Sequence, residues 1–224
     1  MSSGRSGLRV WTVIVAAGSG VRFGGPKQLV EIGSSTALDM AIRSALAVSE
    51  GVVVAAPEQM RHELERPGTL TVAGGDTRSE SVRCGLRSVP ANAQAILVHD
   101  AARPLATPAL FARVVEALEA GEDAVVPVVP VVDSLKRLAD DGSLRSVSRE
   151  NMFAAQTPQG FKADVLRAVH ASGIDTTDDG GAAEAMGVRV ACVDGERTNM
   201  KITTPADLVV ARALAGAYVE RAGQ

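Results

Sequence analysis

A short apolar run near the amino terminus leads directly into a glycine-rich loop. Residues 10–15, VWTVIV, have the continuous hydrophobic pattern of a strand that is buried on both faces of a sheet. Residues 16–28, AAGSGVRFGGPKQ, then combine several glycines with the cations Arg22 and Lys27. Backbone N–H groups and fixed cations both neutralise phosphate oxygens. This stretch therefore predicts a polyphosphate site at the end of the first strand.

The loop matches neither of the two best-known phosphate-binding patterns. Pro26 stands where a Walker A loop has its lysine, and no Ser or Thr follows Lys27. Gly18 and Gly20 fit the start of the dinucleotide fingerprint, but Phe23 occupies the position of its third glycine. The second predicted strand also lacks the acidic residue that would bind a ribose. An NAD-dependent dehydrogenase is thus disfavoured, while a glycine-rich turn without a ligand stays open on spacing alone.

The composition is that of one globular domain. The chain has 224 residues, of which 46% are hydrophobic, so it is long and apolar enough to form the core of one α/β domain. We place this domain at residues 8–220. Its formal net charge of −3 gives no reason to expect a nucleic-acid or membrane partner. Cys84 and Cys192 are interpreted as small core residues, because two distant cysteines favour neither a metal cluster nor a disulfide framework. A cytoplasmic location is expected, and residues 1–7 are predicted to be a disordered tail.

Strand-like and helix-like segments alternate along the rest of the chain. Strands are predicted at 52–56, 70–72, 95–99, 124–132 and 188–193, and helices at 38–49, 58–65, 79–88, 108–120 and from 205 onward. A polar hairpin with strands 132–138 and 144–149 is expected to project from the core. The alternation predicts an α/β fold, a three-layer sandwich with a mainly parallel sheet.

Polar residues follow several of the predicted strands. Asp76 comes after the third strand, and Lys201 comes after the last. Asp100 and Arg103 follow the fourth. Ligands of such folds bind at the carboxyl ends of the strands, so we expect these residues near the glycine-rich loop. Each also has a structural interpretation: Asp76 as a turn residue, Asp100 as the surface ion-pair partner of Arg103, and Lys201 as an ordinary charge before a helix.

Seven segments give the sequence a specific resemblance. In chain order they are AAGSGVRFGGPKQ, GGDTRSESVRCGL, VHDAARP, DSLKR, QTPQGF, TDD and NMKITTPADL. Together they resemble the 2-C-methyl-D-erythritol 4-phosphate cytidylyltransferases of the non-mevalonate isoprenoid pathway. The resemblance extends from about Val10 to Ala213. It depends chiefly on VHDAARP, QTPQ and the loop ending in PKQ, since TDD or a GxG pattern alone has little specificity.

The resemblance implies a Rossmann-like nucleotide-diphospho-sugar transferase fold with a protruding β-hairpin arm at about 132–158. It also implies a reaction in which CTP and methylerythritol 4-phosphate give CDP-methylerythritol and pyrophosphate. The substrate phosphate attacks the α-phosphorus of CTP in line, and needs no general base because it is already ionised. Fixed cations and a divalent metal, expected to be Mg²⁺, would stabilise the negative charge that builds up.

The resemblance also assigns roles to individual residues. The catalytic cations are Arg22, Lys27 and Lys201. The CTP-binding positions are Ala16, Ala17, Gly18, Gly75, Asp76, Ser81 and Asp100, and Asp100 also faces the metal. The substrate-binding positions are Arg103, Ser134, Arg149, Thr157 and Thr177. In this family the arm reaches into a partner subunit, so Arg149 and Thr157 are expected to serve the neighbour's site, which implies a homodimer.

The sequence departs from the family pattern in three places. The loop between Arg22 and Lys27 is shorter than in many members, and Ser134 replaces the usual threonine. Gly180 and Gly181 stand where alanine or serine is usual, and are expected to loosen the start of the helix that follows TDD. The three histidines, His62, His99 and His170, are assigned no role, and His99 is interpreted as structural.

Two alternatives stay open beside this function. A ribitol 5-phosphate cytidylyltransferase would have similar loops and would differ mainly at 133–157 and Thr177. A nucleotide-binding regulatory domain without catalysis is disfavoured, because the catalytic cations occur together with Asp100.

Overall fold

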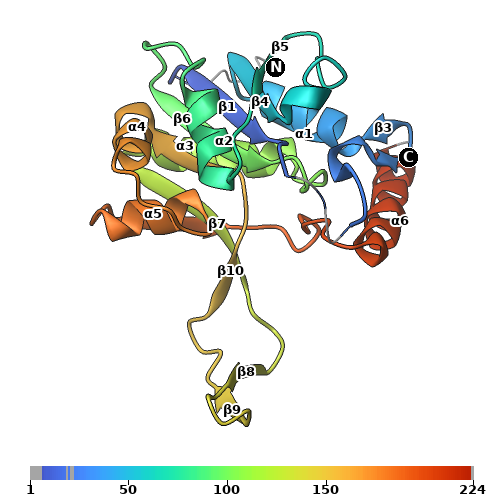
Figure 1. The fold of residues 1–224 in the computed structure, drawn as a ribbon, viewed down its shortest axis with the longest axis vertical. Helices are drawn as coiled ribbons and strands as arrows, with labels where there is room; N and C mark the ends of the chain where they lie inside the picture. The colour runs from blue at the N-terminus through green and yellow to red at the C-terminus, as the bar shows by residue number, and fades with distance from the viewer. Residues whose placement is uncertain (1–6, 19, 21–22, 223–224) are drawn as a thin grey trace.

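The computed structural model describes residues 7–18, 20 and 23–222, and places one mixed sheet between two layers of helices (Figure 1). Within these residues the main sheet has eight strands, in the order β10-β7-β11-β6-β1-β4-β5, and β12 pairs with β7. They are β1 (Val10–Val15), β4 (Gly51–Ala56), β5 (Thr69–Ala73), β6 (Ala95–Asp100), β7 (Ala124–Pro130), β10 (Phe153–Ala155), β11 (Gln159–Lys162) and β12 (Val190–Asp194). β1 pairs in parallel with both β4 and β6, so the strand order changes direction at β1. Ligands of open α/β sheets bind at such a point.

Helices cover both faces of this sheet because its strands are apolar on both sides. The main-sheet helices are α1 (Ala37–Leu46), α2 (Arg78–Leu86), α3 (Pro108–Glu119), α4 (Ala163–Ala171) and α5 (Asp179–Ala185). α1 and α3 share one buried cluster with Ile14 and Leu97, whereas α2, α4 and α5 share the other with Val13 and Ile96. Adjacent strand residues thus point to opposite layers. The predicted three-layer, mainly parallel α/β fold is confirmed.

Threonine side chains cap the N-termini of α1, α2 and α3. Thr36, Thr77 and Thr107 cap α1, α2 and α3 by accepting a hydrogen bond from a backbone N–H of the first turn. A capping box also begins α6 (Pro205–Ala222), since Asp207 accepts from the Thr204 N–H at 2.8 Å and donates its own N–H to Thr204 Oγ1 at 3.4 Å. Hydrogen bonds from Thr203 and Thr204 lower the pKa of Asp207 to about 2.

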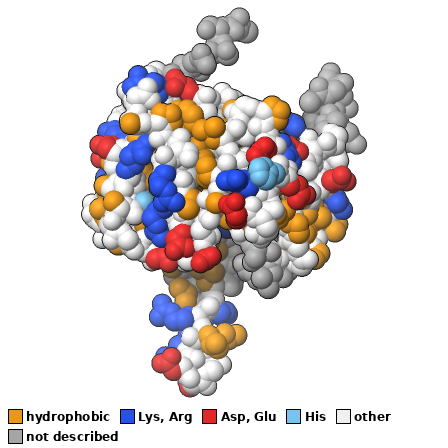
Figure 2. Space-filling view, turned by 45° about the horizontal axis from the view of Figure 1, so that its top comes forward, with side chains coloured by type: hydrophobic (Ala, Val, Ile, Leu, Met, Phe, Trp, Pro, Cys, Tyr) orange, Lys and Arg blue, Asp and Glu red, His pale blue; other side chains and the backbone are white. Residues whose placement is uncertain are grey.

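The predicted hairpin is a ribbon that projects from the sheet. β8 (Leu135–Leu138) and β9 (Leu144–Val147) pair in antiparallel register, and both are shorter than the sequence predicts. The chain reaches them from β7 and returns through β10, so the ribbon lies beyond the helical layers (Figure 1). We call residues 131–152 the arm. Figure 2 shows basic and hydrophobic side chains together on it, and Leu138 and Leu144 are 69% and 66% exposed.

Several local expectations from the sequence are wrong. The helix predicted over 58–65 is only a 3-10 turn, η2 (Glu58–Met60), followed by further turns. Cys84 is partly exposed and Cys192 is exposed on β12, so neither is a core residue; β12 pairs with β7 alone and is an edge strand. The sequence analysis also missed β10, β11 and α4. Of the predicted tail, residues 1–6 lie outside the described residues, while Gly7 donates its N–H to Glu119 at 2.7 Å.

Hydrogen bonds hold the two glycines at the start of α5, and the expectation that they loosen this helix stays a prediction. Asp178 caps this helix by accepting from the Gly181 N–H at 3.0 Å, and Gln159 accepts from the Gly180 N–H at 2.9 Å. The start of α5 is therefore tied both to its own cap and to β11.

Three short elements lie between β1 and α1: η1 (Lys27–Leu29), β2 (Glu31–Ile32) and β3 (Ser35–Thr36). α6 contacts β2 and completes a small separate cluster that includes Leu105 and Ile202. This packing holds the segment around Lys201 beside the sheet. No helix within the described part of the chain is long and apolar enough to cross a membrane.

Candidate active site

A cavity of about 540 Å³ opens at the carboxyl edge of the parallel strands. Its lining comes from the loops that follow β1, β4, β5 and β6, together with η1, α2 and the segment before α6. The residues are Val15, Ala16, Ala17, Gly18, Lys27, Gln28, Pro57, Glu58, Gln59, Gly74, Gly75, Asp76, Thr77, Arg78, Ser81, Asp100, Ala101, Ala102 and Lys201. Every CTP-binding position that the sequence predicts is among them.

The loop after β5 is held close to the loop after β1. A side chain at Gly74 would come within 2.5 Å of Ala17 Cβ, so only glycine permits this approach. Ser81, which is buried on α2, accepts from the Gly75 N–H at 3.1 Å and donates to a backbone carbonyl. Its hydroxyl therefore fixes the backbone of Gly75, while the side chain of Asp76 is exposed at the cavity. This wall presents backbone groups, which suit the recognition of a flat polar ring.

The glycine-rich loop brings Lys27 to the cavity. The Gly20 carbonyl accepts from the N–H groups of Phe23 and Gly24 at 2.8 and 2.9 Å, which closes a tight turn before η1. Lys27 is the first residue of η1 and lines the cavity, and the side chain of Gln28 beside it is buried. Arg22, the other predicted cation of the loop, lies outside the described residues.

Asp100 carries two ion pairs at the end of β6. Its Oδ2 accepts from Lys201 Nζ at 2.6 Å, and its Oδ1 accepts from Arg78 Nε at 3.1 Å. Burial by itself would raise the pKa of this carboxyl, but the charges of Arg78 and Lys201 outweigh burial and hold the pKa well below its usual range. Asp100 is therefore a permanent anion between two cations at neutral pH.

Arg103 has other partners than the sequence suggests. Its guanidinium donates to the carbonyls of Asn199 and Ala155, at 2.8 and 3.3 Å. The interpretation of Asp100 and Arg103 as a surface ion pair is thus wrong, and so is that of Lys201 as an ordinary helix-flanking charge. The hydrogen bond from the Arg103 guanidinium to the Asn199 carbonyl instead links the segment after β6 to the segment that carries Lys201.

A second cavity, of about 220 Å³, shares Arg78, Asp100 and Lys201 with the first. The remaining residues of its lining are Arg103, Ala155, Gln156, Thr157, Gln159, Thr177 and Asp178. Three predicted substrate-binding residues, Arg103, Thr157 and Thr177, thus lie together beside the predicted nucleotide site. The two cavities meet along the three shared charges, which is where two anionic ligands would face each other.

Thr157 is buried beside the end of β6. It is 4% exposed, donates its hydroxyl to His99 Nδ1 at 3.0 Å and accepts from the Asp100 N–H at 3.1 Å. In the single chain Thr157 thus lines the second cavity, and the expectation that it serves a neighbour's site stays a prediction. His99 in turn donates Nε2–H to the Arg103 carbonyl at 3.2 Å, which confirms the structural role expected for this histidine.

Comparison with known proteins matches residues 10–217 to the family described as "IspD: 2-C-methyl-D-erythritol 4-phosphate cytidylyltransferase". The chain belongs to this family. A 2-C-methyl-D-erythritol 4-phosphate cytidylyltransferase of Rhodococcus jostii (strain RHA1) is 46% identical over 215 residues, which cover 92% of this chain and 94% of the relative. The crystal structure of the Thermus thermophilus enzyme of the same name superposes with a TM-score of 0.79 at 38% identity, and covers 91% of this chain and 98% of that one. The resemblance carried by the seven segments is confirmed.

Two substrate-binding positions that were expected from the family resemblance, Ser134 and Arg149, lie away from both cavities. Ser134 and Arg149 are exposed on the arm and line neither cavity. Arg149 donates to the Val132 carbonyl, so it holds the two sides of the arm together at its base. In the single chain these two positions therefore lie outside the candidate site.

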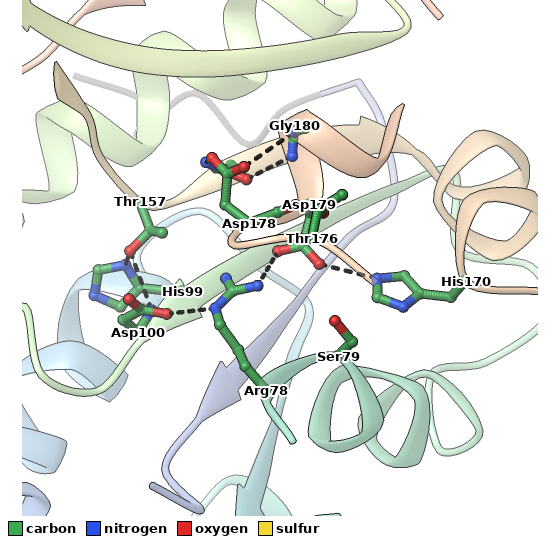
Figure 3. Close-up of polar contacts among 12 residues, drawn as sticks. Arg78, Ser79, His99, Asp100, Thr157, His170, Thr176, Asp178, Asp179 and Gly180 are labelled. Atoms are coloured by element: carbon green, nitrogen blue, oxygen red, sulfur yellow. Dashed lines mark hydrogen bonds and ion pairs between the residues drawn. The ribbon is translucent and has the colours of Figure 1, made fainter. Parts of the chain in front are cut away.

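Arg78 lines both cavities but is not among the site residues predicted from the sequence. Arg78 is the first residue of α2, where a cation is disfavoured by the partial positive charge of a helix N-terminus. An arginine at that position, together with two consecutive aspartates in TDD, was the available signal for a buried ion pair. Figure 3 shows the result: the guanidinium lies between Asp100 and Asp179.

Proposed function

We propose that this chain transfers CMP from CTP to 2-C-methyl-D-erythritol 4-phosphate and releases pyrophosphate. The observation that carries the proposal is the pair of adjoining cavities. One is lined by the glycine-rich loop and the backbone wall at Gly75, and the other by Arg103, Thr157 and Thr177. The charges of Arg78, Asp100 and Lys201 line both. A nucleoside triphosphate in the first cavity and a phosphorylated polyol in the second would meet at this boundary.

The residues at the boundary suit an in-line displacement at phosphorus. Lys27 and Lys201 come from different segments, so they can contact the reacting phosphates from two directions. Cations that are fixed before the reaction stabilise the charge that develops on the α-phosphate and on the leaving pyrophosphate. The acceptor phosphate is already ionised, so this chain needs no side chain to remove a proton. The two ion pairs of Asp100 orient Lys201 before any ligand binds.

A divalent cation, Mg²⁺, fits this site as a ligand shared with the nucleotide. Mg²⁺ is usually held by one or two carboxylates together with substrate phosphates and water. Asp100 supplies one such carboxylate, and each of its oxygens has a second lone pair beyond the ion pair that it already accepts. No cluster of three His, Cys, Asp or Glu side chains suitable for a metal occurs among the described residues, so the phosphates would supply the other ligands. When bound, the metal neutralises phosphate charge.

We also propose that the chain acts as a homodimer through its arm, in the cytoplasm. The arm leaves several apolar side chains exposed, among them Leu138, Leu144 and Met152. A two-stranded ribbon has no core of its own, so a second copy that covers these side chains would stabilise it. Arg149 would then reach the partner's second cavity. Two free cysteines and a CTP substrate are consistent with a cytoplasmic location.

Pyrophosphate release from CTP, measured with Mg²⁺ and a panel of polyol phosphates, tests the proposed reaction. We expect release with 2-C-methyl-D-erythritol 4-phosphate. Release only with ribitol 5-phosphate would transfer the assignment to that acceptor. No release with any acceptor, from protein that still binds CTP in calorimetry, would favour the non-catalytic alternative and contradict the proposal.

A further inference from the structure

Arg78 connects the candidate site to a buried pair of residues on α5 and α4, Asp179 and His170. Its Nε donates to Asp100, and its Nη1 donates to Asp179 Oδ2 at 2.8 Å. The other oxygen of Asp179 accepts from His170 Nε2 at 2.9 Å. A continuous series of contacts therefore runs from the Lys201 ammonium through Asp100, Arg78 and Asp179 to His170, and Figure 3 shows its inner part.

The inner end of this series is more deeply buried than its outer end, and the Arg78 side chain between them is 22% exposed. The Lys201 side chain is 38% exposed and the Asp100 side chain 10%, whereas Asp179 is 1% exposed and His170 5%. The charges also alternate, so each carboxylate lies between two donors. Burial would raise the pKa of Asp179, but the hydrogen bond from His170 and the charge of Arg78 hold the pKa below its usual value. A buried carboxylate with both oxygens occupied can hold a guanidinium in one orientation.

The segment that carries Asp179 is itself fixed from three sides. Ser79 donates to Asp175 at 2.6 Å, which joins α2 to the start of this segment. Gln159 on β11 donates to Asp178 at 2.6 Å. His170 holds Asp179 from α4, and its Nδ1 has no partner among the described residues, so the contact with Asp179 is the polar anchor of the ring. Asp179 is thus held in a fixed position, and its carboxylate restricts the orientation of the Arg78 guanidinium.

We propose that Asp179 and His170 are positioning residues: they fix Arg78, and through Arg78 and Asp100 they fix the ammonium group of Lys201 at the boundary of the two cavities. Neither residue lines either of the two cavities of the candidate site, so both are proposed to act through Arg78. The inference deepens the proposed cytidylyltransferase reaction and rests on it for its kinetic test. Without the Asp179 carboxylate, Arg78 keeps its ion pair with Asp100 but loses the contact that fixes the orientation of its guanidinium. The ion pair between Asp100 and Lys201 then becomes mobile.

The variant Asp179→Asn tests the proposal, because asparagine keeps the shape of the side chain and removes its charge. We expect kcat for pyrophosphate release to fall about tenfold, the size usual for residues that orient a functional group through another residue. The KM for CTP should change little, because the lining of the nucleotide cavity is intact. In a Lys201→Ala background the same substitution should have almost no further effect on kcat, since the group that it positions is gone.

Matched variants separate positioning from general destabilisation. Glu184→Gln removes one exposed carboxylate from the same helix, α5, and should leave kcat unchanged in both backgrounds. His170→Gln keeps an amide N–H donor in reach of Asp179 and should retain most activity, whereas His170→Leu should lose as much as Asp179→Asn. Equal losses from Asp179→Asn with and without Lys201 would overturn the proposal, because they would mean that Asp179 acts on the fold alone.

A second measurement does not depend on catalysis. Acetylation of Lys201 by an amine reagent, followed by mass spectrometry, reports how firmly its nitrogen is held against Asp100. The labelling rate should rise in Asp179→Asn and His170→Leu, and stay at the wild-type rate in Glu184→Gln and His170→Gln. If the wild-type protein releases no pyrophosphate, the proposed reaction fails and the labelling rates still decide this inference; unchanged rates in all four variants would overturn it.

Discussion

At the scale of the residue, Lys27 and Lys201 line the same cavity but are held there in different ways. Lys201 is already oriented by Asp100, whereas Lys27 is carried by the tight turn at Gly20 and the first residue of η1. We expect Lys27→Ala to lower kcat by about 10²–10³, the effect of removing one preorganised donor from a transition state. Lys162→Ala, on an exposed lysine paired with Asp123, is the control and should retain the wild-type rate of pyrophosphate release. An unchanged rate in Lys27→Ala would mean that Lys27 does not contact the reacting phosphates.

His99 makes folding sensitive to pH although it takes no part in the proposed chemistry. Burial lowers the pKa of His99 from 6.5 to about 4, and Nδ1 accepts from Thr157 while Nε2 donates to a carbonyl, which requires the neutral ring. The unfolded chain therefore binds one more proton than the folded chain between these values. The contribution of His99 to the free energy of unfolding should be greatest above pH 6.5, and the free energy of unfolding should decrease by about 2 kcal/mol from pH 7 to pH 5.

Urea unfolding at several pH values measures this loss. In His99→Gln, which cannot titrate, the decrease between pH 7 and pH 5 should be smaller than in the wild type by about the same 2 kcal/mol. Asp100 and Asp179 have lowered pKa values, so their contributions are lost only at more acidic pH and do not overlap this window. A variant with the same pH dependence as the wild type would contradict the assignment to His99.

At the scale of the element, the position of α3 depends on a glycine in the strand below it. Gly160 lies in β11, and a Cβ there would come within 2.4 Å of Val114 and 2.9 Å of Leu97. Both neighbours are fully buried and cannot yield, so Gly160→Ala should lower the free energy of unfolding by about 1–3 kcal/mol. Gly216→Ala, in α6 with nothing within 4 Å of the new Cβ, is the control and should be neutral or slightly stabilising. Chemical denaturation of both variants checks the difference.

The same strand explains what the sequence could and could not predict at this scale. β1, β6 and α3 were predictable because continuous apolar runs and a threonine cap identify them locally. β11 has only four residues, two of them glutamine and lysine, and it exists because β6 and β7 hold it between them. The candidate site divides in the same way. Gly75 and Lys201 lie in recognisable loops and Asp100 ends an apolar strand, whereas Asp179 reaches Arg78 from a segment that only the tertiary fold brings to α2.

At the scale of the whole molecule, the arm differs from the rest of the chain, which we call the body, in where its apolar side chains lie. The body buries its apolar side chains between helices and sheet, while the arm exposes Leu138, Leu144 and Met152. Arg149 lies on the arm and Lys27 on the body, so one chain by itself does not bring these two predicted site residues to one cavity. If a second copy covers the arm, each active site of the dimer combines the Lys27 of one subunit with the Arg149 of the other.

Mixing two impaired variants, assayed at limiting acceptor, tests this arrangement. Arg149→Ala should weaken the polyol phosphate, leave CTP affinity nearly intact and lower activity at limiting acceptor. In a mixed dimer with Lys27→Ala, one of the two sites contains both Lys27 and Arg149, so the mixture should recover on the order of a quarter of wild-type activity after subunit exchange. Mixing Lys27→Ala with Lys201→Ala is the control and should recover none, because both residues line the same cavity of one chain. Recovery in neither mixture, from protein that is dimeric by light scattering, would place Arg149 outside the neighbour's site.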